Sequence, residues 1–116
     1  MIGMRSESDK SKVVDFQPSV SELCATINEL VQDSNNVSWS NHAMERMDER
    51  GITTLDALRV LRIGMIEGPI EPGRSPGEWK CKITAPLKGS REIGVVSVVA
   101  HRQRIFIKTV EWEDLK

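Results

Sequence analysis

The first part of the chain places apolar residues at the spacing of α-helices. From Val20 to Val31, apolar side chains recur at i, i+3, i+4, i+7, i+10 and i+11, which is one stripe along a helix. The stripe begins after Pro18-Ser19 and stops at the polar turn residues 32–36. We therefore expect an amphipathic helix whose stripe either packs on the core of the domain or docks on a partner.

Two further helices are expected before Gly64. One has an N-cap at position 40 or 41 and runs to Arg50, and it ends at Gly51 because glycine readily adopts the left-handed conformation that follows a helix. The other is capped at position 53 or 54 and ends at Gly64. The side chains expected to face inward from this last helix are Leu55, Leu58, Val60 and Leu61.

After Gly64 the period of the pattern changes from 3.6 to two, which is typical of β-strands. Strands are expected at 78–85, 93–100 and 104–112, with a tight turn at Arg102-Gln103 between the last two. Residues 65–71 contain a proline and form at best an edge strand. The expected fold is α+β, with two or three N-terminal helices packed on one face of a three- to four-stranded antiparallel sheet.

Length and composition set the domain organisation. With 116 residues the chain has room for one domain. Residues 1–17 are rich in serine and charged side chains, and we expect a disordered tail there. Residues 18–37 are expected to be an accessory N-terminal helix and linker, and residues 38–116 a single α+β domain.

Composition also excludes several classes of protein. Hydrophobic residues make up 39% and charged residues 28% of the chain, as in an ordinary globular protein. The N-terminus lacks the apolar segment of a signal peptide, and no apolar run has the length of a membrane span. Cys24 and Cys81 are far apart and have no ligand spacing, so we expect buried, unreactive thiols, no metal and no cofactor. This cysteine usage is typical of a cytoplasmic protein.

The net charge of −1 hides an uneven distribution. Residues 1–36 carry three basic and six acidic side chains, whereas residues 74–110 carry eight basic and two acidic ones. If the alternating cations of neighbouring strands share one face, the sheet presents a surface suited to a phosphate backbone. The alternative is a solvated face whose lysines prevent aggregation. The acidic N-terminal segment is a candidate cover for a basic surface.

Three polar residues on the second expected helix form a candidate catalytic group. His42, Arg46 and Arg50 are spaced i, i+4, i+8 and lie on one side of the helix. His42 falls in the first turn, where the helix dipole disfavours imidazolium and free backbone N–H groups favour an anion. A histidine acid or base beside two guanidiniums suits phosphodiester chemistry. The alternative is a histidine bonded to a loop, with arginines in surface ion pairs.

Other residues carry weaker signals. His101, at the end of an apolar strand, is either a second acid or base or an exposed residue of the hairpin. The large aromatic side chains are expected in the core, with the first also a possible base-stacking residue: Trp39, Trp79, Phe106 and Trp112.

Two segments resemble a known bacterial family of unknown function, DUF4258. The stretch from His42 to Thr53, HAMERMDERGIT, is similar to its His-Ala…Arg-Met…Glu-Arg-Gly-Ile signature. Lys108-Thr109-Val110-Glu111-Trp112 resembles the Thr-Val-aromatic ending of its last strand, with Glu111 inserted. The resemblance covers roughly residues 38–113.

The family is similar in layout to toxin ribonucleases of the RelE, BrnT and MqsR kind, and the resemblance implies an RNA-directed, toxin-like domain in residues 38–116. It implies a metal-independent endoribonuclease with His42, Arg46 and Arg50 as catalytic residues, and an antitoxin protein as partner. The residues expected to bind the RNA substrate are Lys80, Lys82, His101, Arg102, Arg104, Lys108 and Thr109. In such a layout helices cover one sheet face and RNA the other, so His42 and the strand lysines meet only at an edge.

Different functions remain open at this stage. One is a non-catalytic domain that binds a protein through its N-terminal helix or sheet edge. Another is a nucleic-acid-binding domain without catalysis. The protein-binding role involves no membrane, and the nucleic-acid-binding role requires only the basic surface.

Overall fold

The computed structural model describes residues 17–87 and 91–113. The helices of these residues are α2 (Val20–Leu30), the 3-10 helix η2 (Ser34–Asn36), α3 (Asn41–Arg50) and α4 (Thr54–Ile63). The strands are β1 (Val37–Trp39), β2 (Met65–Pro72), β3 (Glu78–Pro86), β4 (Glu92–Ala100) and β5 (Arg104–Trp112). The expected tail, apart from Gln17, lies outside the described residues.

The helix ends follow from local sequence. The Ser40 hydroxyl accepts a hydrogen bond from the Ala43 N–H at 2.9 Å, which caps α3. Gly51 ends the same helix in the left-handed region, with φ 69°. Thr53 and Asp56 form a reciprocal capping box at the start of α4. The predicted bounds of α3 and α4 are confirmed.

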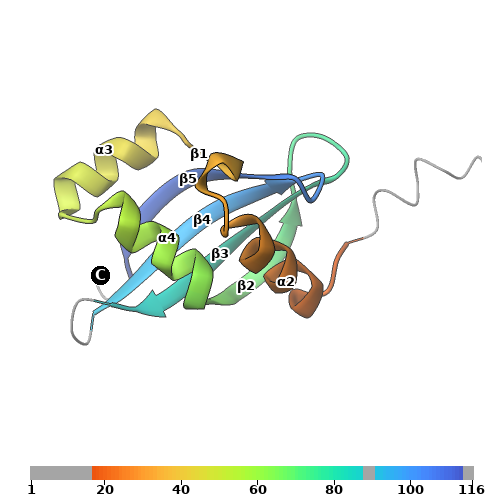
Figure 1. The fold of residues 1–116 in the computed structure, drawn as a ribbon, viewed down its shortest axis with the longest axis horizontal. Coiled ribbons are helices and arrows are strands. Elements are labelled where there is room, and N and C mark those ends of the chain that lie inside the picture. Colours follow the sequence, from red (N-terminus) through yellow and green to blue (C-terminus); the bar gives the residue numbers. More distant parts are fainter. Residues whose placement is uncertain (1–16, 88–90, 114–116) are drawn as a thin grey trace, which may run out of the picture.

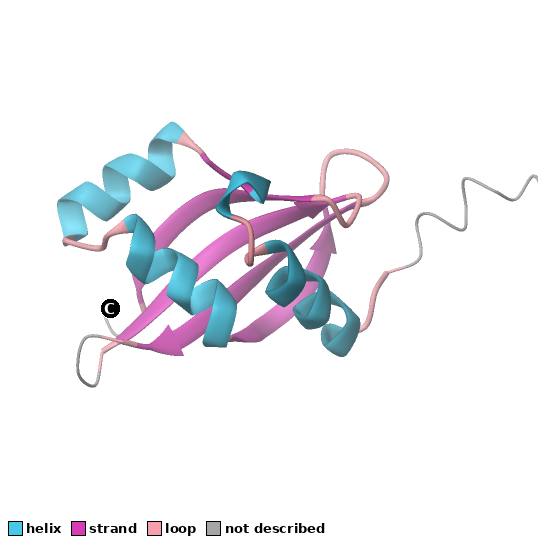
Figure 2. Ribbon diagram, viewed as in Figure 1, coloured by secondary structure: helices cyan, strands magenta, loops and turns pink. Residues whose placement is uncertain are grey.

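The sheet, drawn in magenta in Figure 2, has five strands among the described residues, in the order β1-β5-β4-β3-β2. Strand β1 runs parallel to β5, while every other neighbouring pair is antiparallel. The expectation of a three- to four-stranded antiparallel sheet is therefore wrong. The expectation missed β1 because its three residues, Val37–Trp39, are too short to show a period, and their pairing with β5 depends on residues about 68 positions away.

The turn between β4 and β5 also differs from the expectation. Its two central residues are His101 and Arg102, both with positive φ of 55° and 59°, and the Gln103 N–H donates to the Ala100 carbonyl at 2.9 Å. The predicted turn at Arg102-Gln103 is thus wrong by one residue. Two positive φ values belong to the primed turns that match strand twist, but they are usually supplied by Asn-Gly, so the sequence carried no such signal here.

Helices α2, α3 and α4 all lie on the same side of the sheet (Figure 1). Beneath them, the strands contribute alternate side chains to one core, including Ile83, Val95 and Ile107. The opposite side of the sheet, which we call the open face, has no helix over it in the described part of the chain (Figure 1). The predicted α+β layout with helices on one sheet face is confirmed.

Helix α4 turns a different side to the core than its leucines suggest. Ala57, Val60 and Leu61 are buried, whereas Leu55 is 76% exposed. Residues two positions apart lie about 200° apart around a helix, so Leu55 and Ala57 cannot both face inward. The prediction that Leu55 faces the core is therefore wrong, because the small Ala57 allows close approach to the sheet.

Helix α2 packs on the same core. Leu23, Ile27 and Leu30 are buried among residues of the sheet and α4. Cys81, on β3, is also buried, and desolvation raises the pKa of its thiol to about 12, whereas Cys24 on α2 is only partly buried. The α2 stripe is thus turned to the core in this chain.

Substituting Ile27→Ala is expected to lower the free energy of unfolding by about 2–5 kcal/mol, because the side chain is 2% exposed and its removal leaves a cavity. The matched control is Val20→Ala on the same helix, where the side chain is 51% exposed and the change is expected to stay within about 0.5 kcal/mol. Urea unfolding of both variants measures the difference. Equal losses would mean that α2 is not part of the cooperative fold.

Candidate nucleic-acid interface

The open face is hollowed between the β2–β3 loop and the middle of β5. This concavity, which we call the open-face groove, has a volume of about 540 Å³. The strand register explains its composition, because Lys80, Val98 and Phe106 lie side by side in one row across β3, β4 and β5. The groove is lined by Pro72, Gly73, Arg74, Glu78, Lys80, Val98, Ala100, Phe106 and Lys108.

Three cations, one carboxylate and an exposed aromatic ring line this groove. Phe106 is 40% exposed, and Arg74, Lys80 and Lys108 line the groove with it. The Lys80 ammonium lies 3.6 Å from the Glu71 carboxylate, while Arg74 and Lys108 form no side-chain ion pair with any residue in 17–87 or 91–113. Cations of β3 and β5 thus share one face, as a continuous basic surface requires.

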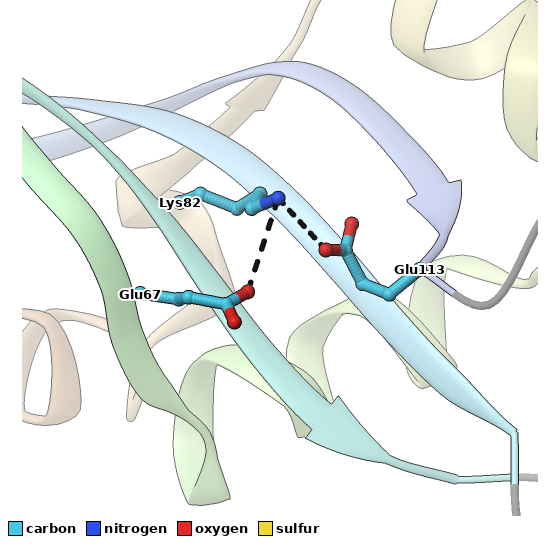
Figure 3. Close-up of polar contacts among 3 residues, drawn as sticks. All are labelled: Glu67, Lys82 and Glu113. Atoms are coloured by element: carbon cyan, nitrogen blue, oxygen red, sulfur yellow. Dashed lines mark hydrogen bonds and ion pairs between the residues drawn. The ribbon is translucent and has the colours of Figure 1, made fainter. Parts of the chain in front are cut away.

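Lys82 has a different environment from Lys80. Its Nζ donates a hydrogen bond to Glu113 Oε1 at 2.7 Å and lies 3.9 Å from Glu67 Oε1 (Figure 3). The Glu113 hydrogen bond is the main cause that raises the pKa of Lys82. Glu113 crosses over Gly94, where a Cβ atom would clash with its carboxylate. The positive charge of Lys82 is therefore balanced by carboxylates of the protein itself.

The carboxylates around Lys82 also reduce the positive charge of the sheet. The basic segment 74–110 excludes four acidic residues that stand before and after it in sequence: Glu67, Glu71, Glu111 and Glu113. Counted from residue 65 to residue 113, the chain carries eight basic and six acidic side chains. The positive region of the open face is therefore smaller than the segment suggests, and it is centred on the groove.

The Lys82–Glu113 pair predicts a dependence of stability on alkaline pH. Because the folded pKa of Lys82 is above its ordinary value of 10.5, the pair stabilises the fold below that pH and stops doing so as pH rises through the folded pKa. Glu113→Gln should remove this contribution, which is less than about 1 kcal/mol for a partly exposed pair. Unfolding free energies of parent and variant should therefore converge as pH rises above about 10.

The control for that measurement is Glu71→Gln, because Glu71 approaches Lys80 only to 3.6 Å and both side chains are about half exposed. Its pH profile should follow the parent. A Glu113→Gln profile that stays parallel to the parent throughout the alkaline range contradicts the assignment.

The residues expected to be catalytic lie on α3, and none of them lines the open-face groove. His42 is exposed in the first turn, and Arg46 Nη1 forms an ion pair with Glu49 Oε1 at 2.9 Å. Arg50 is half-buried, and its carbonyl accepts a hydrogen bond from Trp112 Nε1 at 3.1 Å. The Arg46 side chain thus has an ion-pair partner, whereas Arg50 makes this contact through its backbone, and His42 faces solvent.

The start of α3 is nevertheless attached to the strand that carries Lys108. The Ser40 N–H donates to the Ile107 carbonyl at 3.0 Å, and the Ser40 hydroxyl donates to the Lys108 carbonyl at 2.9 Å. Strand β1 ends at Trp39, so beyond that point the edge of β5 is flanked by α3 instead. The first turn of α3, which contains His42, therefore lies beside the β5 end of the groove.

The remaining expected substrate-binding residues are divided between the two sides of the sheet. Arg104 and Thr109 lie at open-face positions, paired with Ala100 and Val96. His101 and Arg102 instead line a second cavity of about 350 Å³, which we call the hairpin pocket. This pocket is lined by Pro18, Glu22, Leu23, Thr26, Gly77, Trp79, Val99, His101 and Arg102.

Sequence reasoning missed two residues of the groove. Phe106 was expected in the core, but its neighbours Ile105 and Ile107 are fully buried and alternation places Phe106 on the open face. That alternation was a usable signal. Arg74 lies in the loop before β3, where no periodicity exists, and only the folded chain brings it to the groove.

Two absences in the described part of the chain and three comparisons with known proteins bear on the kind of protein this is. Among the described residues, no helix is long and apolar enough to span a membrane, and no three His, Cys, Asp or Glu side chains cluster as a metal site. Searches of curated proteins and of solved structures find no significant match. The model of the family described as "Domain of unknown function (DUF4258)" matches residues 39–112, from β1 to the end of β5 and without α2. The chain belongs to this DUF4258 family.

Proposed function

We propose that this protein binds single-stranded RNA on its open face. The observation that carries the proposal is the open-face groove, where Phe106 is exposed among Arg74, Lys80 and Lys108. An exposed large aromatic ring on a sheet has no role in the core of the domain. Single-stranded nucleic acids are bound by this combination of a positively charged groove and a ring on which a base stacks.

The distribution of charge supports a path for the strand. Glu67 and Glu113 surround Lys82 toward one end of β2, and they would repel a phosphate there. Arg74 and Lys108 line the groove with Phe106 and form no ion pair with a carboxylate of the described residues, although Glu78 lines the groove as well. The RNA therefore crosses the groove between these two cations, with one base on Phe106.

The experiment that tests the proposal is fluorescence anisotropy with a labelled single-stranded RNA over a series of salt concentrations. Phe106→Ala is expected to weaken binding by roughly fivefold to a hundredfold, since stacking of one base contributes about 1–3 kcal/mol. The control is Leu55→Ala, another exposed large apolar side chain, on the helix side of the molecule. Absence of RNA binding even at low salt contradicts the proposal and favours a protein partner on this face.

A second candidate function is cleavage of the bound strand, and the Ser40–Lys108 hydrogen bond favours it. An RNA leaving the groove past Lys108 would reach the first turn of α3, where His42 is exposed. There the imidazole would accept the 2′-hydroxyl proton or protonate the leaving oxygen, and the N-terminal backbone N–H groups of α3 would stabilise charge on the phosphate. An antitoxin that covers the open face would compete with RNA for both steps.

A further inference from the structure

The hairpin pocket lies on the helix side of the sheet and is separate from the open-face groove. Its walls come from α2, which contributes Leu23, and from helix-facing positions of β3 and β4, which contribute Trp79 and Val99. With a volume of about 350 Å³, it is within the usual size range of small-molecule sites. The family match begins at residue 39, so one wall of this pocket is formed by a helix outside it.

The β4–β5 turn directs two cation-forming side chains to the mouth of the pocket. His101 and Arg102 both hold positive φ, a conformation that such side chains rarely adopt. The His101 N–H donates to the Gly77 carbonyl at 2.8 Å, and its ring lies so close to Gly77 that a Cβ atom there would be 2.6 Å from Nδ1. These contacts hold the turn in place although its residues disfavour it. Backbone strain of this kind is often found at functional sites.

The charged groups at the mouth suit a ligand that has both an anionic group and a hydrogen-bond donor. The Arg102 guanidinium forms no ion pair or hydrogen bond with any residue of the described segments. Glu22 also lines the pocket, and one of its oxygens accepts the Ser19 N–H at 2.9 Å, which leaves carboxylate lone pairs for a ligand. That hydrogen bond and, to a smaller extent, the charge of Arg102 lower the pKa of the Glu22 carboxyl, so the two side chains already attract each other across water. The mouth therefore offers both an anion-binding group and a hydrogen-bond acceptor.

We infer that the hairpin pocket binds a nucleoside monophosphate group, either free or at the end of an RNA strand. The base lies between Leu23, Val99 and the ring of Trp79, and its amino group donates to Glu22. The phosphate contacts Arg102 and His101 at the mouth. A planar ring suits the apolar walls, and a phosphate suits a guanidinium that forms no ion pair within the described residues, so one ligand uses both kinds of group.

The experiment titrates the full chain with adenosine monophosphate, followed by calorimetry and by the indole N–H signals of the three tryptophans. Saturable binding is expected, with the Trp79 signal moving and those of Trp39 and Trp112 unchanged. Adenosine alone and inorganic phosphate alone should each bind more weakly. Arg102→Gln should weaken binding at least tenfold, whereas Arg59→Gln, an equal charge change on the exposed side of α4, should leave it unchanged.

No saturable binding of adenosine monophosphate, or equal affinity in the Arg102→Gln and Arg59→Gln variants, would overturn the inference. Because the tryptophan signals are read on the parent chain, the result does not depend on a variant that folds. Competition by a 5′-phosphorylated short RNA, but not by its unphosphorylated counterpart, would assign the site to strand ends; competition by neither would assign it to the free nucleotide. Phe106→Ala should leave this binding intact, which separates it from RNA binding in the groove.

Discussion

Replacing Arg74 and Lys108 together by glutamine is expected to weaken binding of single-stranded RNA by about thirtyfold at low salt. Both side chains line the open-face groove, and neither has an ion-pair partner within the described residues, so their charge is available to phosphates. Each phosphate contact with a single strand contributes about 0.7 to the slope of log affinity against log salt. The double variant should therefore lower that slope by about 1.4.

The matched control is the double variant Arg59→Gln with Arg62→Gln, which removes the same charge from exposed positions of α4 on the other layer. It should change affinity only by the small long-range effect of net charge, with the salt slope nearly unchanged. A third variant, Lys80→Gln, should have a smaller effect than Lys108→Gln, because Glu71 already competes for the Lys80 ammonium. Equal losses in the two double variants would show that RNA is attracted by net charge and not by the groove.

For the cleavage candidate, His42→Ala is expected to lower the rate of RNA cleavage by about 10²–10⁴, the range that a positioned acid or base contributes. RNA affinity should stay close to that of the parent, because His42 does not line the open-face groove. The measurement is single-turnover cleavage of a labelled RNA at saturating protein, with growth of cells expressing each variant as a second readout.

Asn41→Ala is the control for this variant, because it is the exposed neighbour of His42 in the same first turn and has no acid–base function. It should cleave like the parent. If the parent binds RNA without cleaving it, or if His42→Ala cleaves at the parental rate, His42 has no catalytic role. RNA binding in the groove would stand in either case, since different residues carry it.

Local sequence was sufficient to predict the elements whose ends depend on nearby residues. The ends of α3 were readable because Ser40 caps its own helix within three residues and Gly51 takes a conformation that glycine prefers. Strand β3 was readable because its alternation spans eight residues, β4 because residues 93–100 form an apolar run on both faces, as in a central strand, and β5 because it follows β4 after a short turn. Alternation gave the face of each lysine within its own strand, but the shared face of Lys80 and Lys108 required the register of both strands with β4, which lies between them.

The tertiary structure alone decided everything that depends on distant residues. Strand β1 exists because it pairs with β5, and the neutralisation of Lys82 depends on Glu67 and Glu113, which are 15 and 31 positions away. The separation of His101 and Arg102 from the groove depends on a one-residue difference in the turn. A period in the sequence reports which side of an element a residue lies on, because that is a local property of the backbone. Which charges then meet is determined by packing and strand register, which no local pattern encodes.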